Sequence, residues 1–185
     1  MDNGASSYRR FLDGDDRGIA VIVGEYKDGL ILYLNGYVGN IFIAEELTEN
    51  TFFRLITKKP QYAGKSTFKS WLYAIGRHIA VDFLRHHAKI CSTPIDDMEA
   101  YLRAEEDLEQ AYIREERKIA LHRALSKLPT QYKAVLWLVY FEDFSGKETA
   151  IVLKKNDRQI KNLLYRARQS LKATLEKEGF TYEEL

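Results

Sequence analysis

The chain has 185 residues, of which 45% are hydrophobic and 30% charged, and its formal net charge is +1. This length suits one large domain or two small ones, and the hydrophobic content excludes a wholly disordered chain. No run of about 18 apolar residues is present, and the acidic N-terminus lacks the apolar core of a signal peptide. We therefore expect no membrane association and a cytoplasmic location. The one cysteine, Cys91, cannot form an internal disulfide, which agrees with a reducing compartment.

The charges are unevenly distributed along the chain. Residues 1–50 carry four Lys/Arg against nine Asp/Glu, whereas residues 51–90 carry eight against one. Residues 91–117 carry three against nine, and residues 118–185 carry thirteen against eight. Two basic blocks separated by an acidic one predict two surfaces that bind polyanions, joined by a segment that repels phosphate. The alternative is that each block is only a solvated face.

The N-terminal part combines a strand-like composition with helical spacing. The stretches IAVIVGEY and LILYLNGYV are rich in β-branched and aromatic residues, which favour strands. Apolar residues nevertheless recur at spacings of three and four from Tyr26 to Tyr37, and residues 44–59 repeat this pattern. We therefore expect helix throughout, including residues 18–39.

Residues 66–87 have the length and spacing of one helix with two different faces. An apolar stripe predicts the side that packs on neighbouring helices: Phe68, Leu72, Ile75, Ile79 and Phe83. The opposite arc and its flanks carry mainly aromatic and basic side chains: Trp71, Tyr73, Arg77, His78, Leu84, Arg85, His86 and His87. Rings stack on unpaired bases at about 1–3 kcal/mol each, and cations hold phosphates. This arc therefore predicts a surface for single-stranded nucleic acid, although Trp71 and Tyr73 are also compatible with burial against another helix.

A break follows this helix. Pro94 disfavours helix at the residue before it, and Asp96 and Asp97 come next. Residues 98–118 permit a helix but offer only a thin apolar face, so we interpret them as a partly ordered linker. The predicted organisation is a helical domain at 7–89, an acidic linker at 90–117 and a second helical domain at 118–178.

The C-terminal part has the signals of a helix-turn-helix. Pro129 stands near the start of one helix, and Ser145 and Glu148 form a capping box that starts a second. After a turn at Lys154, Asn156 caps a third helix with Gln159 at the reciprocal position. The third helix has a buried stripe and a polar far side, the latter comprising Arg158, Lys161, Asn162, Tyr165 and Gln169. Arg or Lys can pair with guanine, and Asn or Gln with adenine, in the major groove.

Two segments resemble conserved regions of one family, the extracytoplasmic-function (ECF) branch of bacterial RNA polymerase sigma factors. The segment AEELTENTFFRLITKKPQYAGKSTFKSWLYAIGRHIAVDFLRHHAK is similar to sigma region 2. The segment LSKLPTQYKAVLWLVYFEDFSGKETAIVLKKNDRQIKNLLYRARQSL is similar to region 4. The resemblance implies an all-α chain in which a region 2 helical bundle is joined by a linker to a region 4 helix-turn-helix domain.

The resemblance also implies a function and partners. It implies a factor without enzymatic activity, cofactor or metal, which binds core RNA polymerase, recognises minus-thirty-five and minus-ten promoter elements and promotes DNA melting. Its expected partners are the clamp helices of the largest polymerase subunit, the flap of the second-largest subunit, and promoter DNA in duplex and single-stranded form. An anti-sigma factor is a further partner that the family allows.

Residue roles follow from the same resemblance. The implied polymerase-binding residues are Leu47, Glu49, Thr51, Phe52 and Arg54. The implied minus-ten residues are Lys65, Ser66, Phe68, Trp71, Tyr73, Arg77, His78 and Arg85. The implied minus-thirty-five residues are Arg158, Gln159, Lys161, Asn162, Tyr165, Arg166 and Arg168. The chain departs from the usual family pattern at several positions: Glu49–Asn50, His78, Lys154–Lys155 and Leu163.

Two other classes of protein are compatible with parts of the sequence. A helix-turn-helix regulator that binds duplex DNA without polymerase explains residues 118–178 but leaves the helix at 66–87 without a task. A metal-dependent enzyme is suggested only by His86, His87 and Cys91, since a structural zinc site needs four ligands and a catalytic one needs three. The sequence places no further ligand, so we expect no metal site.

Overall fold

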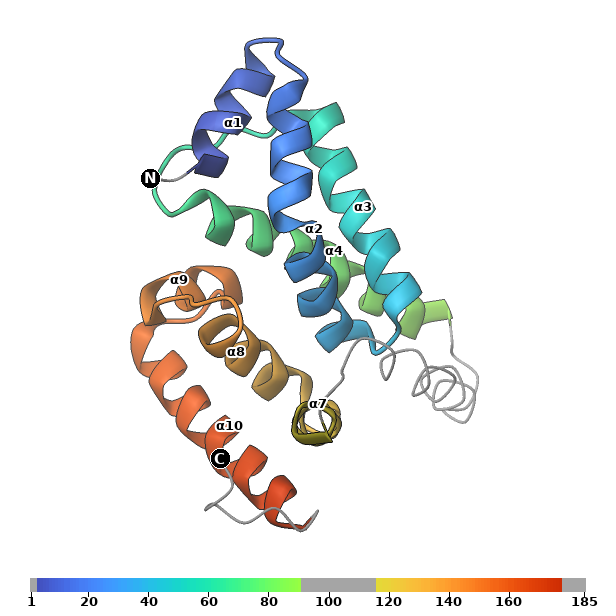
Figure 1. Ribbon diagram of the computed structural model, residues 1–185, viewed down its shortest axis with the longest axis vertical. Helices are drawn as coiled ribbons and strands as arrows, with labels where there is room; N and C mark the ends of the chain where they lie inside the picture. Colours follow the sequence, from blue (N-terminus) through green and yellow to red (C-terminus); the bar gives the residue numbers. More distant parts are fainter. Residues whose placement is uncertain (1–2, 91–115, 178–185) are drawn as a thin grey trace.

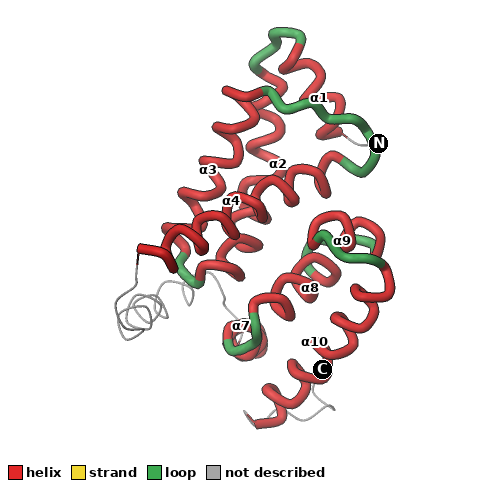
Figure 2. Tube along the Cα trace, turned by 180° about the vertical axis from the view of Figure 1, so that it is seen from behind, coloured by secondary structure: helices red, strands yellow, loops and turns green. Residues whose placement is uncertain are grey.

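The computed structural model describes residues 3–90 and 116–177, and every element within these ranges is an α-helix (Figures 1 and 2). In chain order the helices are α1 (Asn3–Leu12), α2 (Arg17–Val38), α3 (Ile41–Lys58), α4 (Phe68–Ile90), α7 (Glu116–Ser126), α8 (Thr130–Tyr140), α9 (Gly146–Leu153) and α10 (Asp157–Lys177). The predicted all-α fold is confirmed. Most of the predicted acidic linker, with Cys91, lies outside the described residues.

Helix α2 forms where the composition favoured strands. Ile22, Tyr26, Leu30 and Leu34 recur every four residues and are all buried, and α2 contacts α1, α3 and α4. Burying one such side chain contributes about 1.5–3 kcal/mol, whereas ordinary helix propensities differ by only about 0.7 kcal/mol. Packing therefore outweighs local propensity. The helix ends at Gly39, whose φ of 67° is left-handed.

Helix α3 starts at a side-chain cap. Asn40 accepts a hydrogen bond on Oδ1 from the Ile43 N–H at 2.9 Å, which satisfies one of the donors left free at a helix start. The apolar stripe of α3 then faces the other helices of this unit, with Leu47 and Leu55 buried. This geometry leaves the opposite side of α3 in solvent.

An aromatic cluster ties the start of α4 to the N-terminal helix. Phe68 and Trp71 of α4 contact Tyr8 of α1 and Tyr62 of the preceding loop, with ring centroids 5.3 to 5.6 Å apart. The Tyr8 hydroxyl donates to the carbonyl of Pro60 at 2.8 Å, and burial raises the pKa of Tyr8 to about 12. The cluster thus positions the loop at residues 59–67 against α1 and α4.

The C-terminal unit contains the predicted helix-turn-helix. Ser145 accepts from the Glu148 N–H while Glu148 accepts from the Ser145 N–H, so the predicted capping box of α9 is present. The turn to α10 passes through Lys154, which has φ 53° and ψ 50°. Asn156 and Gln159 then exchange two hydrogen bonds of 2.9 Å, which confirms the predicted cap of α10. Helix α10 packs against α7, α8 and α9.

The two helical units lie against each other. Helix α4 contacts α9, and α2 contacts α8 (Figure 1). Figure 2 shows the same arrangement from behind, with α9 next to the start of α4. The C-terminal unit therefore covers part of the helix on which the sequence predicts a nucleic-acid surface.

Candidate nucleic-acid and polymerase interfaces

The outer face of α10 is polar, basic and open to solvent. All seven residues predicted for duplex recognition are exposed: Arg158, Gln159, Lys161, Asn162, Tyr165, Arg166 and Arg168. Tyr165 is 65% exposed. The Arg168 guanidinium lies 5.4 Å from the centre of the Tyr140 ring. The face therefore offers cations for phosphates and amides for base edges on one side of a single helix.

The orientation of this face is set by the turn before it. Ile160 and Ala167 are buried on the inner side of α10, which fixes the rotation of the helix about its axis. The N–H of Lys155 donates to the Ala150 carbonyl at 3.0 Å, so the left-handed Lys154 is held within a hydrogen-bonded turn. Without glycine this conformation costs about 1–2 kcal/mol.

The predicted minus-ten loop is accessible. Lys65 is exposed and Ser66 is half-buried, and Gly64 before them has a left-handed φ of 68°. The Tyr62 hydroxyl donates to the Ser66 carbonyl, which ties the loop back on itself. Lys65 can therefore approach a phosphate without rearrangement of α4.

Two residues predicted for the minus-ten surface are buried: Phe68, as its place on the apolar stripe indicates, and Tyr73, whose burial corrects its expected place on the solvent-facing arc. Phe68 has no exposed surface and lies within the aromatic cluster. Tyr73 is 1% exposed, because its ring packs 5.2 Å from Tyr33 on one side and 5.3 Å from Phe144 of the C-terminal unit on the other. Burial raises the pKa of Tyr73 well above its ordinary value. The alternative of burial against other helices holds for Tyr73.

The remaining predicted residues of α4 lie at the surface to different degrees. Trp71 is half-buried in the aromatic cluster. His78 and Arg85 are exposed, and both contact Asp82, at 3.1 Å and 3.5 Å. Arg77 is half-buried and lines a cavity of about 70 Å³ between the two units. Its Nε has no hydrogen-bond partner among the residues that the structure describes.

Helix α3 divides the predicted polymerase-binding residues between two faces. Glu49 and Arg54 are exposed, but Leu47, Thr51 and Phe52 are 3%, 0% and 6% exposed and belong to the core. These three side chains pack inside their own unit, so a partner that docks on α3 would meet other side chains, and the assignment of α3 as the polymerase-binding helix stays a prediction. The exposed apolar side chains of α3 are others, which the sequence reading missed: Phe42, Phe53 and Ile56. Their position off the buried stripe is the signal that would have identified them.

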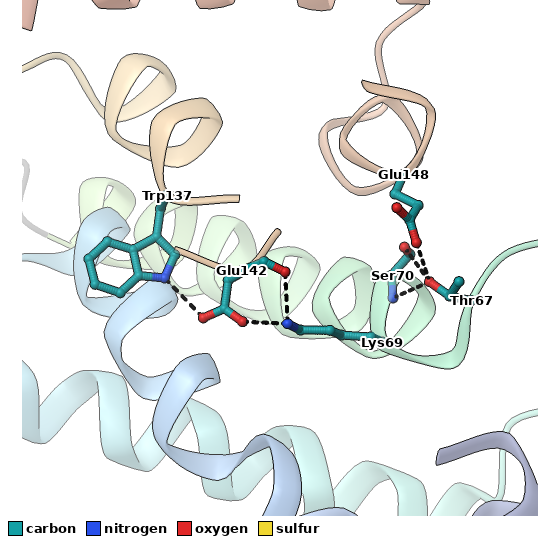
Figure 3. A network of polar contacts seen from close by, with 6 residues as sticks. All are labelled: Thr67, Lys69, Ser70, Trp137, Glu142 and Glu148. Atoms are coloured by element: carbon teal, nitrogen blue, oxygen red, sulfur yellow. Dashed lines mark hydrogen bonds and ion pairs between the residues drawn. The ribbon is translucent and has the colours of Figure 1, made fainter. Parts of the chain in front are cut away.

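Polar contacts join α4 to the loop and helix that follow α8 (Figure 3). Lys69 contacts the Glu142 carboxylate at 2.8 Å, and the Thr67 hydroxyl donates to Glu148 at 2.9 Å. Trp137 donates from Nε1 to Glu142 at 3.2 Å. Burial raises the pKa of Glu148, but hydrogen bonds from Ser145 and Thr67 outweigh it, so that the pKa is lowered. Sequence reasoning did not anticipate this network, because contacts between separate domains leave no periodic signal.

Two family models match the chain, "Sigma-70 region 2" over residues 22–90 and "Sigma-70, region 4" over residues 118–171. The ECF RNA polymerase sigma factor SigM of Bacillus subtilis is 30% identical over 148 residues, which cover 80% of this chain and 89% of SigM. The chain belongs to the ECF RNA polymerase sigma factors. The sigma factor SigV of the same organism is 28% identical over 163 residues, covering 88% of this sigma factor and 94% of SigV.

Solved structures share the fold of this sigma factor. CnrH, solved in complex with the cytosolic domain of CnrY, superposes with a TM-score of 0.66 at 20% identity, covering 95% of this chain and 96% of CnrH. The sigma factor RpoE, in complex with the anti-sigma factor NepR from Bartonella quintana, superposes with a TM-score of 0.62 at 18% identity, covering 85% and 96%. The family consists of transcription initiation factors rather than enzymes.

Two further observations concern the described part of the sigma factor. No group of three His, Cys, Asp or Glu side chains there is placed to hold a metal ion. None of its helices has both the length and the apolar stretch needed to cross a bilayer.

Proposed function

We propose that this sigma factor directs core RNA polymerase to promoters by reading the minus-thirty-five element with α10 and the minus-ten element with the loop at 59–67 and α4. The observation that carries the proposal is the outer face of α10, on which all seven predicted side chains are exposed. Buried Ile160 and Ala167 hold this face outward. A helix presented in this way fits the major groove of a duplex.

The minus-ten surface is narrower than the sequence suggested. With Phe68 and Tyr73 buried, the accessible groups are Lys65 and Ser66 of the loop, together with Trp71, His78 and Arg85. We propose that the loop receives an unpaired base and that Lys65 of the loop, with the basic side chains further along α4, holds the phosphates of the melted strand. The free energy for strand opening then comes from binding the unstacked bases more tightly than the paired duplex.

The proposed polymerase contact is on the solvent-exposed side of α3. Phe42 and Phe53 are 60% and 62% exposed, and Glu49 and Arg54 lie on the same helix. Large exposed apolar groups among charged ones are typical of a protein interface. We propose that this side of α3 binds the clamp helices of the polymerase, that region 4 contacts the flap, and that the factor acts in the cytoplasm.

An anti-sigma factor is a further proposed partner. RpoE, which shares the fold of this chain, was solved with the anti-sigma factor NepR. A protein that covers α3 or the outer face of α10 would block the contacts proposed above.

Transcription with purified core polymerase on a fragmented genomic template tests the proposal. We expect discrete runoff transcripts only when the sigma factor is added, and permanganate-reactive thymines upstream of their starts. Tight, specific binding of the sigma factor alone to duplex DNA, with no transcripts, would instead support a regulator that acts without polymerase.

Variants of α10 test the assignment of the duplex surface. Arg158→Ala and Lys161→Ala should each weaken promoter binding by the holoenzyme, by about 1–3 kcal/mol if the side chain contacts a base. Lys27→Ala, which removes an exposed cation from α2, serves as the control and should bind as the wild type does. Equal binding by all three variants would contradict the assignment.

A further inference from the structure

The loop after α8 places one carboxylate between the two units. The N–H groups of Phe141 and Phe144 donate to the carbonyls of Trp137 and Leu138, each at 2.9 Å. These bonds fold the chain back onto the end of α8, with Asp143 between them at a left-handed φ of 57°. The loop is therefore held by its own backbone, and the Glu142 side chain projects from it toward α4 (Figure 3).

The Glu142 carboxylate is buried and paired across the two units. Its side chain is 9% exposed, and Oε2 lies 2.8 Å from the Lys69 ammonium. The same ammonium donates to the Glu142 carbonyl at 2.9 Å, and Trp137 donates to Oε1 at 3.2 Å. A buried carboxylate needs such partners, because it has given up its hydration. Contact between the units is therefore what pairs this charge.

A glycine of α2 makes room for the same carboxylate. A Cβ added at Gly29 would lie 2.6 Å from the Tyr73 hydroxyl and 2.8 Å from Glu142 Oε1. Glycine inside a helix is unfavourable, so α2 gives up intrinsic stability at this position. Gly24 is on the same helix and would meet no atom within 4 Å. Close approach of Glu142 and Tyr73 thus accounts for glycine at 29.

Two further contacts join α4 to the C-terminal unit along the same boundary between the units. Phe144 packs on Tyr73, and the Lys69 ammonium lies 5.1 Å from the centre of the Phe144 ring. Thr67, at the start of α4, donates to Glu148 of α9. The C-terminal unit therefore presents two carboxylates and a ring to α4, where the proposed function places phosphates and bases.

The closed arrangement is incompatible with simultaneous contact to both promoter elements. The minus-thirty-five and minus-ten elements are centred about 25 base pairs apart, which is roughly 85 Å of duplex at 3.4 Å per step. The contacts of α4 with α9 and of α2 with α8 hold the two units directly against each other. Binding both elements therefore requires the units to separate.

We propose that Glu142 is an intramolecular latch, which closes region 4 over α4 in the free sigma factor and lowers its activity until the units part. The consequence for activity rests on the proposed function of α4, whereas the closure itself does not. When only the open state binds a partner, the apparent affinity for that partner falls in proportion to the fraction of sigma molecules that are open.

Gly29→Ala tests the latch, with Gly24→Ala as the matched control. Both variants add the same methyl group and the same helix propensity to α2, but only the first displaces Glu142 and Tyr73. Because the clash is with the ends of two side chains, α2 can keep its backbone. Glu142→Gln, which removes the charge opposite Lys69, is the second opening variant and carries the test if circular dichroism shows that Gly29→Ala is misfolded.

The first measurement is the distance between spin labels at positions 46 and 173, which are exposed on α3 and α10, in a chain whose Cys91 is replaced by serine. We expect one narrow distance distribution for the wild type and Gly24→Ala, and a longer, broader distribution for the opening variants. An unchanged distance in both opening variants would overturn the latch, whether or not the chain supports transcription.

The second measurement is the sigma concentration that gives half-maximal runoff transcription with core polymerase. The opening variants should need at least about threefold less protein than the wild type and Gly24→Ala. Opening without this gain would refute the inhibitory role of closure. A wild type that yields no transcripts would refute the proposed function, while the distance measurement still decides whether the latch exists.

Discussion

The left-handed residue between α9 and α10 gives a direct test of how the sequence holds α10, the helix proposed to read duplex DNA. Lys154 has φ 53° and ψ 50° and is exposed, so replacing it with glycine removes strain with little loss of packing. Relief of a left-handed side chain contributes about 1–2 kcal/mol. Glycine also increases the entropy of the unfolded chain, which costs about 0.4–1 kcal/mol. Lys154→Gly should therefore stabilise the sigma factor by about 0.5–1 kcal/mol.

The matched variant is Lys155→Gly, at the next position. Lys155 does not have a positive φ, so glycine there gives no relief and should destabilise by about 0.4–1 kcal/mol. Both variants lose one positive charge, so the difference between their free energies of unfolding, about 1–2 kcal/mol, reports the effect of the left-handed backbone alone. Urea unfolding followed by circular dichroism measures it. The reasoning fails if Lys154→Gly is no more stable than Lys155→Gly.

Two other predictions follow from α3 and from the seam between the units. Phe53→Ser should lower affinity for core polymerase at least about tenfold without unfolding the chain, because Phe53 is 62% exposed. Val21→Ser, at an exposed position of α2, is the control. Equal affinities of the two variants would count against the α3 interface. The lowered pKa of Glu148 means that its ionised form stabilises the fold above about pH 4.5 and that this stability is lost as pH falls through the folded pKa. The urea midpoint should therefore decrease on acidification from about pH 6 to about pH 3, and less steeply in Glu148→Gln, which retains a capping-box residue.

Much of the fold could be predicted because its signals are local. The spacing of Tyr26 and Leu30 indicated a helix against their strand-favouring neighbours, and burial of that stripe shows why spacing was the better guide. The capping pairs Ser145–Glu148 and Asn156–Gln159 are defined within four residues, so they can be recognised without tertiary information.

The errors at the candidate site have a different cause. A helical wheel assigns one buried stripe to α4, but Tyr73 is buried on a second side by Phe144, about seventy positions later in the chain. On α3, the family motif indicates a helix but not which of its sides is exposed, so it points to buried Leu47 for polymerase binding and passes over exposed Phe53. Whether such a side chain is buried or exposed depends on which helices pack together, and no local sequence pattern encodes that packing.

The hydroxyl of Tyr8 supports the loop at residues 59–67, which is the proposed minus-ten loop. The stretch that matches region 2 begins at residue 22, yet Tyr8 lies in the preceding helix and holds the Pro60 carbonyl at the root of that loop. Its ring also packs against the rings of Phe68 and Trp71. The loop of this sigma factor is thus held in place by a helix that lies outside residues 22–90, the stretch that matches region 2.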